Sequence, residues 1–350
     1  MGRIVFQSYP PVSEVPMTSA LARRPFPLIP LALLAACNTE TSTERVLGIQ
    51  AMSFATSEWS EPVHLDAPVN SPCQDQTPTL SKDELSLYFT STRRGGLGND
   101  TPDGCQDSFD LWVAQRASRD SPWETAVNLG PPVNTSANEA GPALSADGHL
   151  LFFYSFVGTG QRDIYLSQRR GATDDLVWEA PVSLGPDVNT MDSEAGPSFV
   201  QPGEDGGGTL YFYRGAAPNT ELYSVSITRS GGTLGPAVAV AELNSPVDDN
   251  HGSVRADGRE IFFNSRRLGS ILNPGGQPSF DLWVATRRSL HDAWSTPVNL
   301  GAPVNSAAAE FHPNVSHDGR TLLFIDPSGA VRGGLGGFDI WMTTRTVNGN

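Results

Sequence analysis

Short alternations of apolar and polar residues, separated by turns rich in Gly, Pro and Asp, recur between residues 59 and 345. The segment 281–287, DLWVATR, carries apolar side chains at both odd and even positions. Successive side chains of a strand point to opposite faces, so this pattern indicates a sheet packed between two others. In SADGHLLFF, the pair Asp147-Gly148 supplies the positive φ angles of a tight hairpin. The pattern predicts many short antiparallel strands and an all-β fold.

Three phrases recur five times in the same order. The first begins with Trp, and its clear copies are residues 59–70, 123–134, 178–189 and 294–305, with a degenerate copy from Gly232. The second is a hairpin whose clearest copies are built on Ser-x-Asp-Gly, at 145–148 and 316–319, and the third reads Asp-Leu/Ile-Trp-x-x-x-Arg in its clearest copies. Four short strands per unit and five units predict a five-bladed β-propeller over residues 59–345.

The two ends of the repeat array complement each other. The last copy stops after its third strand at Arg345, while residues 59–65 form a fourth strand without a blade. Docking strand 59–65 onto the C-terminal blade removes the exposed strand edges of an open array. We therefore predict a ring closed by the N-terminal strand.

Two glycine clusters precede third strands, RRGGLGND at 93–100 and RGGLGG at 332–337. A phosphate-binding loop needs the N-terminus of a helix behind it, because the free N–H groups of the helix hold the anion. Here a strand follows each cluster. The clusters are therefore interpreted as turns rather than as a nucleotide site.

The phrases S-x-D-G-x-x-L-x-F and D-[LI]-W-x-x-x-R, as in residues 145–153, 316–324 and 281–287, resemble the WD-repeat-like, TolB-type propeller repeat of bacterial envelope proteins. The resemblance covers about residues 59–345. It implies a propeller with roles in protein interaction and envelope integrity, and those roles vary too widely within the family to fix one for this chain.

The N-terminal part of the sequence has the character of an export signal. Arg23 and Arg24 precede the apolar run FPLIPLALLAAC, which ends at Cys37. A basic segment, a short apolar run and small residues before a cleavage point are typical of a secretory signal. Residues 1–16 lack this character, so Met17 is a candidate start.

The segment LAAC at 34–37 resembles a bacterial lipobox, which implies lipidation of Cys37; the alternative is an ordinary signal with a chance cysteine. We expect a signal peptide at 1–36, a tether at 37–58 and a C-terminal tail at 346–350. Asn38 is not the aspartate that often retains lipoproteins at the inner membrane. An outer-membrane lipoprotein facing the periplasm or the exterior is therefore expected, anchored through lipid only.

Composition excludes some classes of partner. The 350 residues carry a formal net charge of −15, and no basic patch is evident, so nucleic-acid binding is not expected. No cofactor is predicted, and the propeller is expected to be monomeric. An exported chain meets an oxidising compartment, so Cys73 and Cys105 are predicted to form a disulfide, with two free thiols as the alternative.

Aligned copies place an acid at the same position of each link between blades. These candidate loop-face acids are Asp75, Glu139, Glu194, Asp249 and Glu310. A second acidic set opens each third strand: Asp110, Asp163, Glu221, Asp281 and Asp339. Carboxylates crowded around a channel repel one another unless they are hydrogen-bonded or bridged by a cation. Repetition favours a structural role in which each acid fixes its own loop.

Departures from the repeat are more informative about chemistry. Asp249/His251 and Glu310/His312 share the pattern acid-x-His in adjacent blades, where other copies have Thr or Gly instead of His. Residues i and i+2 of an extended segment point the same way. Two carboxylates and two imidazoles suit a divalent metal, so these four residues are a candidate metal site; ordinary loop histidines are the alternative.

The favoured hypothesis is a non-enzymatic envelope lipoprotein whose loop-rich face binds an envelope protein or a cell-wall glycan. The rival is a glycan-active hydrolase using carboxylates at the channel mouth. Such an enzyme needs acids in different environments, whereas these acids are copies in copied surroundings. The repeated tryptophans of the third strands, Trp112, Trp283 and Trp341, are interpreted as packing between blades rather than as a sugar-stacking platform.

Overall fold

The computed structural model describes residues 59–156, 160–171, 174–202, 206–327 and 331–346. The predicted signal peptide, the lipidation site Cys37 and the tether lie outside the described residues, so they stay predictions. Within the described residues the secondary structure is entirely strand and turn, and no helix there is long and apolar enough to span a membrane.

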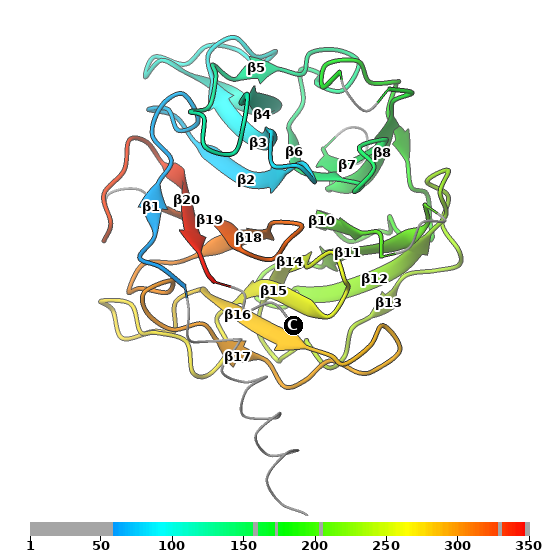
Figure 1. The fold of residues 1–350 in the computed structure, drawn as a ribbon, viewed down its shortest axis with the longest axis vertical. Helices are drawn as coiled ribbons and strands as arrows, with labels where there is room; N and C mark the ends of the chain where they lie inside the picture. The colour runs from blue at the N-terminus through cyan, green and yellow to red at the C-terminus, as the bar shows by residue number, and fades with distance from the viewer. Residues whose placement is uncertain (1–58, 157–159, 172–173, 203–205, 328–330, 347–350) are drawn as a thin grey trace, which may run out of the picture. The chain divides into compact units, whose positions relative to one another are not determined.

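The strands form five antiparallel sheets of four strands each (Figure 1). Blade 1 contains β2 (Asp75–Leu80), β3 (Ser86–Arg93), β4 (Cys105–Gln115) and β5 (Val127–Asn128). Blade 2 contains β6 (Glu139–Leu144), β7 (Leu150–Ser155), β8 (Asp163–Gln168) and β9 (Val182–Ser183). Blade 3 contains β10 (Glu194–Val200), β11 (Gly208–Arg214), β12 (Glu221–Ile227) and β13 (Val238–Ala239).

Blade 4 contains β14 (Asp249–Val254), β15 (Glu260–Ser265), β16 (Asp281–Thr286) and β17 (Val298–Asn299). Blade 5 contains β18 (Phe311–Val315), β19 (Thr321–Pro327), β20 (Phe338–Thr344) and β1 (Val63–His64). The inner strands β2, β6, β10, β14 and β18 surround the centre, and each contacts the next, including β18 with β2 (Figure 1). The five-bladed propeller is confirmed.

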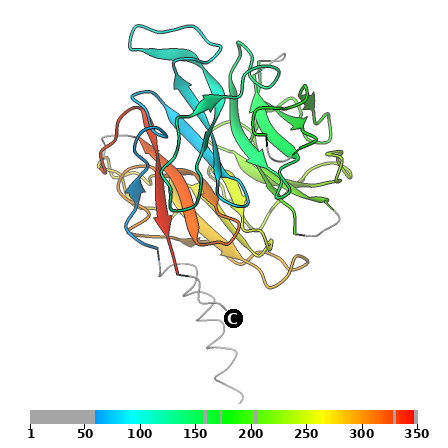
Figure 2. The same cartoon turned by 45° about the horizontal axis from the view of Figure 1, so that its top comes forward.

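The N-terminal strand closes the ring as predicted. β1 pairs with β20 in register Val63 with Met342, and a bridge joins Trp59 to Arg345. Figure 2 shows the blue N-terminal strand beside the red C-terminal one. This pairing leaves β20 with a neighbour on each side, so its edge is not exposed.

The core is divided into five apolar clusters, one in each gap between adjacent blades. Trp112, Trp283 and Trp341 are each at most 6% exposed and belong to three of these clusters. The tryptophans therefore pack between blades, as predicted. Alternating apolar residues on both faces of the strands are explained by this arrangement, because every sheet is covered on both sides.

Two elements of the repeat have structural roles that recur around the ring. The arginine after the third strand stacks on the tryptophan before the fourth, with Cζ 4.2–4.6 Å from the ring centroid, in four blades. The asparagine that ends the first phrase accepts a bond from, and donates one to, a third-strand backbone: Asn70, Asn134, Asn189, Asn244 and Asn305. These contacts explain why the two phrases are repeated.

A disulfide joins Cys73, in the link before β2, to Cys105, the first residue of β4. The predicted pairing is confirmed. It closes a segment of 32 residues that contains the first glycine cluster, and so restrains the long loop of blade 1.

Candidate binding site in the central channel

Two cavities lie along the central channel. We call the face where the inner strands begin the loop face, because it carries the links between blades and the loops between second and third strands. The opposite face carries the Ser-x-Asp-Gly turns and is called the hairpin face. The loop-face cavity has a volume of about 330 Å³, and the hairpin-face cavity about 100 Å³. His251 and His312 line both cavities and therefore lie between them.

Each inner strand has a bulge at the same position, where its register against the second strand shifts. The residue at the bulge has a positive φ angle in every blade: Thr77 (+47°), Gly141 (+67°), Gly196 (+62°), His251 (+48°) and His312 (+51°). Residues with a side chain rarely adopt this conformation, and such strain persists where the surrounding structure imposes it. The two histidines therefore occupy a position that is glycine in blades 2 and 3 and Thr77 in blade 1.

The two imidazoles meet in the channel. Their ring centroids are 3.7 Å apart, and the His251 ring lies 5.0 Å from that of Tyr213. His251 is 8% exposed, and His312 Nδ1 is buried without a hydrogen-bond partner among the described residues. Burial lowers the pKa of His251 well below its ordinary value and that of His312 to about 3, and the charge of Arg162 acts in the same direction. Both rings are therefore neutral at neutral pH.

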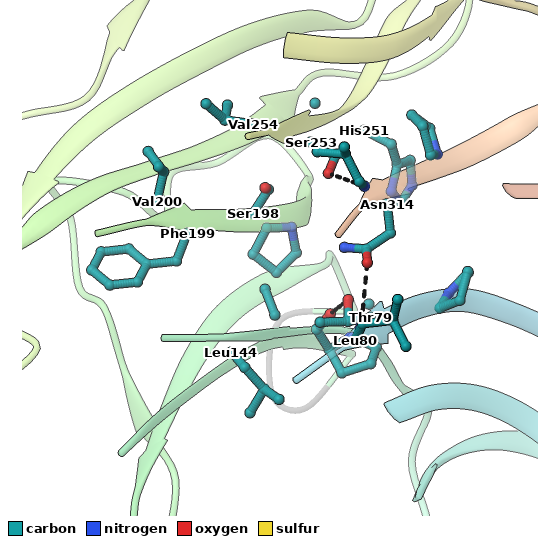
Figure 3. A pocket seen from close by; sticks show the side chains of 18 of the residues that line it. Thr79, Leu80, Leu144, Ser198, Phe199, Val200, His251, Ser253, Val254 and Asn314 are labelled. Carbon is teal, nitrogen blue, oxygen red and sulfur yellow. Dashed lines mark hydrogen bonds between the residues drawn. The ribbon is translucent and has the colours of Figure 1, made fainter. Parts of the chain in front are cut away.

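Figure 3 shows the hairpin-face cavity, with His251 among the residues that line it. Its small polar side chains hold the inner strands to one another. Thr79 Oγ1 donates to the carbonyl of Pro142 (2.6 Å), Asn314 Oδ1 accepts from the amide of Leu80 (3.1 Å), and Ser253 Oγ accepts from the amide of Val315 (3.0 Å). These polar groups form hydrogen bonds between blades, so at this end of the channel they hold the ring together.

The loop-face cavity is different in composition. Six of its twelve lining residues are Phe or Tyr: Phe109, Tyr154, Phe156, Tyr213, Phe311 and Phe338. Its other polar side chains are Gln76, the two histidines and Arg162. The guanidinium of Arg162 donates to Tyr213 Oη (2.7 Å), and its Cζ lies 5.7 Å from the centroid of the Phe156 ring. No Asp or Glu of the described residues lines this cavity.

The candidate loop-face acids have a structural role. All five are at most 1% exposed, and each accepts a bond from the Ser or Thr four residues before it: Asp75, Glu139, Glu194, Asp249 and Glu310. In four blades the same carboxylate also pairs with an arginine, namely Arg93, Arg214, Arg267 or Arg332. Burial raises the pKa of Asp75, Glu139 and Glu310, that of Glu310 to about 7.

The second acidic set holds the glycine-rich loops. Asp110, Asp281 and Asp339 are fully buried and accept the amides of Leu97 (2.6 Å), Ile271 (2.7 Å) and Leu335 (2.6 Å). A Cβ at Gly96 would lie 2.2 Å from Asp110 Oδ2, so the backbone passes too close to the carboxylate for a side chain. The glycine clusters are therefore turns wrapped around an aspartate. Asp163 and Glu221, in the blades with short loops, are more exposed.

The predicted metal set does not assemble. Its imidazoles meet, but Asp249 pairs with Arg267, and Glu310 pairs with Arg332. The prediction assumed that residues i and i+2 point the same way, whereas the bulge at His251 and at His312 breaks this alternation. Among the described residues, no group of three or more His, Cys, Asp or Glu side chains is placed to hold a metal ion.

Sequence reasoning missed Arg162 and the aromatic wall. A signal was present, because Tyr154 and Tyr213 occupy the position that is Thr90 in blade 1 and Asn264 in blade 4. These departures become informative only once the register shows that the position faces the channel.

No family model matches the chain, and no curated protein matches it. Solved structures share its fold. A thermostable family-43 glycoside hydrolase has a TM-score of 0.53 and 13% identity over 81% of this chain and 93% of that one. The catalytic domain of the GH62 α-L-arabinofuranosidase of Coprinopsis cinerea has a TM-score of 0.52 and 11% identity over 83% and 97%. A putative TolB of Agrobacterium tumefaciens has a TM-score of 0.45 and 16% identity over 83% and 92%.

At these identities the similarity shows the propeller fold alone, and the TolB score is too low to carry an argument. The glycoside hydrolases share the fold. Function must therefore be argued from the site of this chain.

Proposed function

We propose that this chain is a non-enzymatic cell-envelope lipoprotein whose loop face binds a protein or cell-wall partner. The loop-face cavity carries the proposal: its wall is aromatic, and its polar groups are few. Concave sites with an apolar wall and a small number of placed polar groups are typical of binding sites. Phe156 is 38% exposed at the mouth and is available to a partner.

A glycan-active hydrolase is the second candidate, because hydrolases are prominent among proteins of similar fold. Glycoside hydrolysis uses two carboxyl groups on either side of the scissile bond, about 5–9.5 Å apart. Glu310 has the raised pKa of an acid catalyst, about 7. It is nevertheless fully buried, bonded to Ser306 and Arg332, and absent from both cavity walls. The described carboxylates are therefore not placed for glycoside hydrolysis, and binding is the better-supported function.

The decisive experiment is crosslinking of the full chain in intact cells, followed by identification of the captured partner. We expect one reproducible envelope partner, with capture reduced by Phe156→Ala, by Phe338→Ala and by trimming the loops around Asp100 and Asn273. Val238→Ala is the matched control, because Val238 is an exposed apolar residue of the outer strand β13.

Capture that is insensitive to all the mouth variants would contradict the proposal. So would hydrolysis of a cell-wall or plant glycan by the purified chain, if a carboxylate variant abolished it. A purified chain that cleaves no glycan while the mouth variants lose the partner would favour binding over catalysis.

A further inference from the structure

Arg162 is unusual among the arginines of this propeller. Most arginines that are largely buried have a carboxylate partner: Arg93, Arg116, Arg169, Arg214, Arg255, Arg266, Arg267, Arg332 and Arg345. Arg287 has none, but it donates to the carbonyl of Gly258 and stacks on Trp294. Arg162 also has no ion pair with a carboxylate among the described residues, although it lines a cavity.

The surroundings of Arg162 direct its charge into that cavity. Its Nη1 donates to Tyr213 Oη, which fixes one edge of the guanidinium. No hydrogen bond from its Nε or Nη2 to the described residues occupies the other edges. A guanidinium whose donors are free and whose counter-charge is missing favours a planar anion, because the fork of N–H groups matches a carboxylate.

The other polar groups of the cavity leave this positive charge uncompensated. Gln76 is neutral, and so are His251 and His312 at neutral pH. His312 Nδ1 is buried and has no partner among the described residues, so a second polar contact is available deeper in the channel. In a chain with a net charge of −15, this cavity is a local positive site that attracts anions.

We infer that the loop-face cavity recognises a carboxylate presented by an apolar segment of a protein partner, with Arg162 as the group that binds it. The inference rests on the proposed function and names the chemistry of its partner. The aromatic wall receives the apolar part of the segment, and Tyr213 holds the guanidinium in position.

A peptide carboxylate fits this wall better than an acidic sugar does. A sugar acid brings several hydroxyl groups, and each needs a hydrogen-bond partner when it is buried. The wall offers six aromatic side chains but few neutral polar ones, Gln76 and the two imidazoles. A chain end or an acidic side chain beside an apolar residue brings no such hydroxyl groups, and its carboxylate is met by the guanidinium.

The test is calorimetric titration of the full chain, purified in detergent, with three small probes. N-acetylphenylalanine carries the carboxylate, its amide is the neutral counterpart, and glucuronic acid is the acidic sugar. We expect the first to bind about tenfold or more tightly than either of the others. Raising salt from about 50 to about 500 mM is expected to weaken its binding, because the contact is ionic and partly exposed.

Variants identify the group responsible. Arg162→Gln is expected to weaken N-acetylphenylalanine binding about tenfold or more, and Arg162→Lys to weaken it less. Tyr213→Phe is expected to weaken it several-fold, about three to five, because the guanidinium loses its orienting bond. Arg320→Gln, at an exposed arginine of the hairpin face without an ion pair among the described residues, is the matched control and is expected to leave affinity unchanged. Thermal unfolding confirms that each variant is folded.

Equal binding of the amide, or unchanged affinity in Arg162→Gln, would overturn the inference. Tighter binding of glucuronic acid would replace the peptide with an acidic glycan. Failure of all probes to bind, together with normal capture of the cellular partner by Arg162→Gln and lost capture by Phe156→Ala, would reject the carboxylate but leave the proposed function standing. Loss of capture of the cellular partner by Arg162→Gln would support both the carboxylate inference and the proposed function.

Discussion

The inner strands of blades 2 and 3 have the same bulge as those of blades 4 and 5, but the residue at the bulge differs: it is Gly in blades 2 and 3 and His in blades 4 and 5. In blades 2 and 3 the bulge residue is Gly141 or Gly196, and a tyrosine of the second strand fills the space. A Cβ at Gly141 would lie 2.7 Å from the Tyr154 ring, and one at Gly196 would lie 2.9 Å from the Tyr213 ring.

In blade 4 the second strand carries Asn264 at this position, and His251 fills the channel from the bulge. Blade 5 has Ile325 and His312 in the same relation. In blades 2 to 5 the channel is thus filled either by a ring from the second strand or by a ring from the bulge, and none of these four blades uses both; blade 1 has Thr77 and Thr90 at the two positions. The histidines therefore fill space that a tyrosine ring fills in blades 2 and 3, and they also bring two imidazoles into the channel.

The largest expected effect comes from placing a side chain at the bulge of a blade whose second strand already carries a tyrosine. Gly196→Ala places a Cβ within 2.9 Å of Tyr213 and 2.7 Å of His251 Nδ1. It also gives a side chain to a residue with φ of +62°. We expect a loss of about 3 kcal/mol in the free energy of unfolding, measured by chemical denaturation. Gly130→Ala is the control, since Gly130 has φ of +63° but no atom within 4 Å of the added Cβ, and we expect it to cost about 1 kcal/mol. Equal losses in the two variants would contradict the packing argument.

The histidine blades are expected to show a pH dependence that the glycine blades lack. The pKa of His312 is lowered to about 3 in the folded state, against about 6.5 in the unfolded chain. The unfolded state therefore binds the proton more readily between these values, and stability is lost as the pH falls from about 6.5 towards about 3. We expect His312→Asn to reduce this loss by about 2 kcal/mol, measured as the free energy of unfolding against pH.

Asparagine is chosen because it tolerates positive φ angles. The exposed His291, substituted in the same way, is the control and is expected to leave the pH profile of the wild-type chain in place. An unchanged profile in His312→Asn would show that the imidazole is solvated in the folded state.

A double substitution tests whether ring and bulge compete for the same space. Tyr213→Asn gives blade 3 the second-strand residue of blade 4, and it removes the ring that Gly196→Ala would meet. We expect the two changes together to cost about 1–2 kcal/mol less than the sum of the single costs. Additive costs in a double-mutant cycle would show that the steric conflict lies elsewhere, for instance with His251.

The smallest effect is expected for the reverse change. His312→Gly relieves the strain of a side chain at φ of +51° but removes the contact with His251. Because these contributions oppose each other, we expect the free energy of unfolding to change by less than about 1 kcal/mol. A loss of several kcal/mol in thermal or chemical unfolding would show that packing, rather than ligand contact, retains the histidine.

The repeat made the fold predictable, because strand number, blade number and ring closure all follow from copied phrases. The disulfide followed from two cysteines in one blade. The structural roles of individual residues within the repeated phrases were harder to predict. The pairing of Asp75 with Arg93 joins residues 18 apart, and the sequence pattern gives no sign that they meet.

The site was harder to predict for a physical reason. The bulge at His251 and His312 inserts a residue that breaks the alternation of faces, and a bulge leaves no mark in the hydrophobic pattern. The metal set failed for that reason, although the two imidazoles of that set do meet. Arg162 stands before a third strand in a single blade, so comparison of the copies did not single it out.

The closure of the ring also sets how far the chain tolerates shortening from its amino end. Trp59 and Val63 pair with Arg345 and Met342, so the edge of β20 that faces away from β19 has a partner only while that segment is present. Proteolysis beyond residue 58 would leave β20 as an open edge with unpaired backbone groups. Open edges of this kind recruit the strands of other molecules. A chain trimmed a few residues too far would therefore fail by self-association rather than by loss of its binding residues.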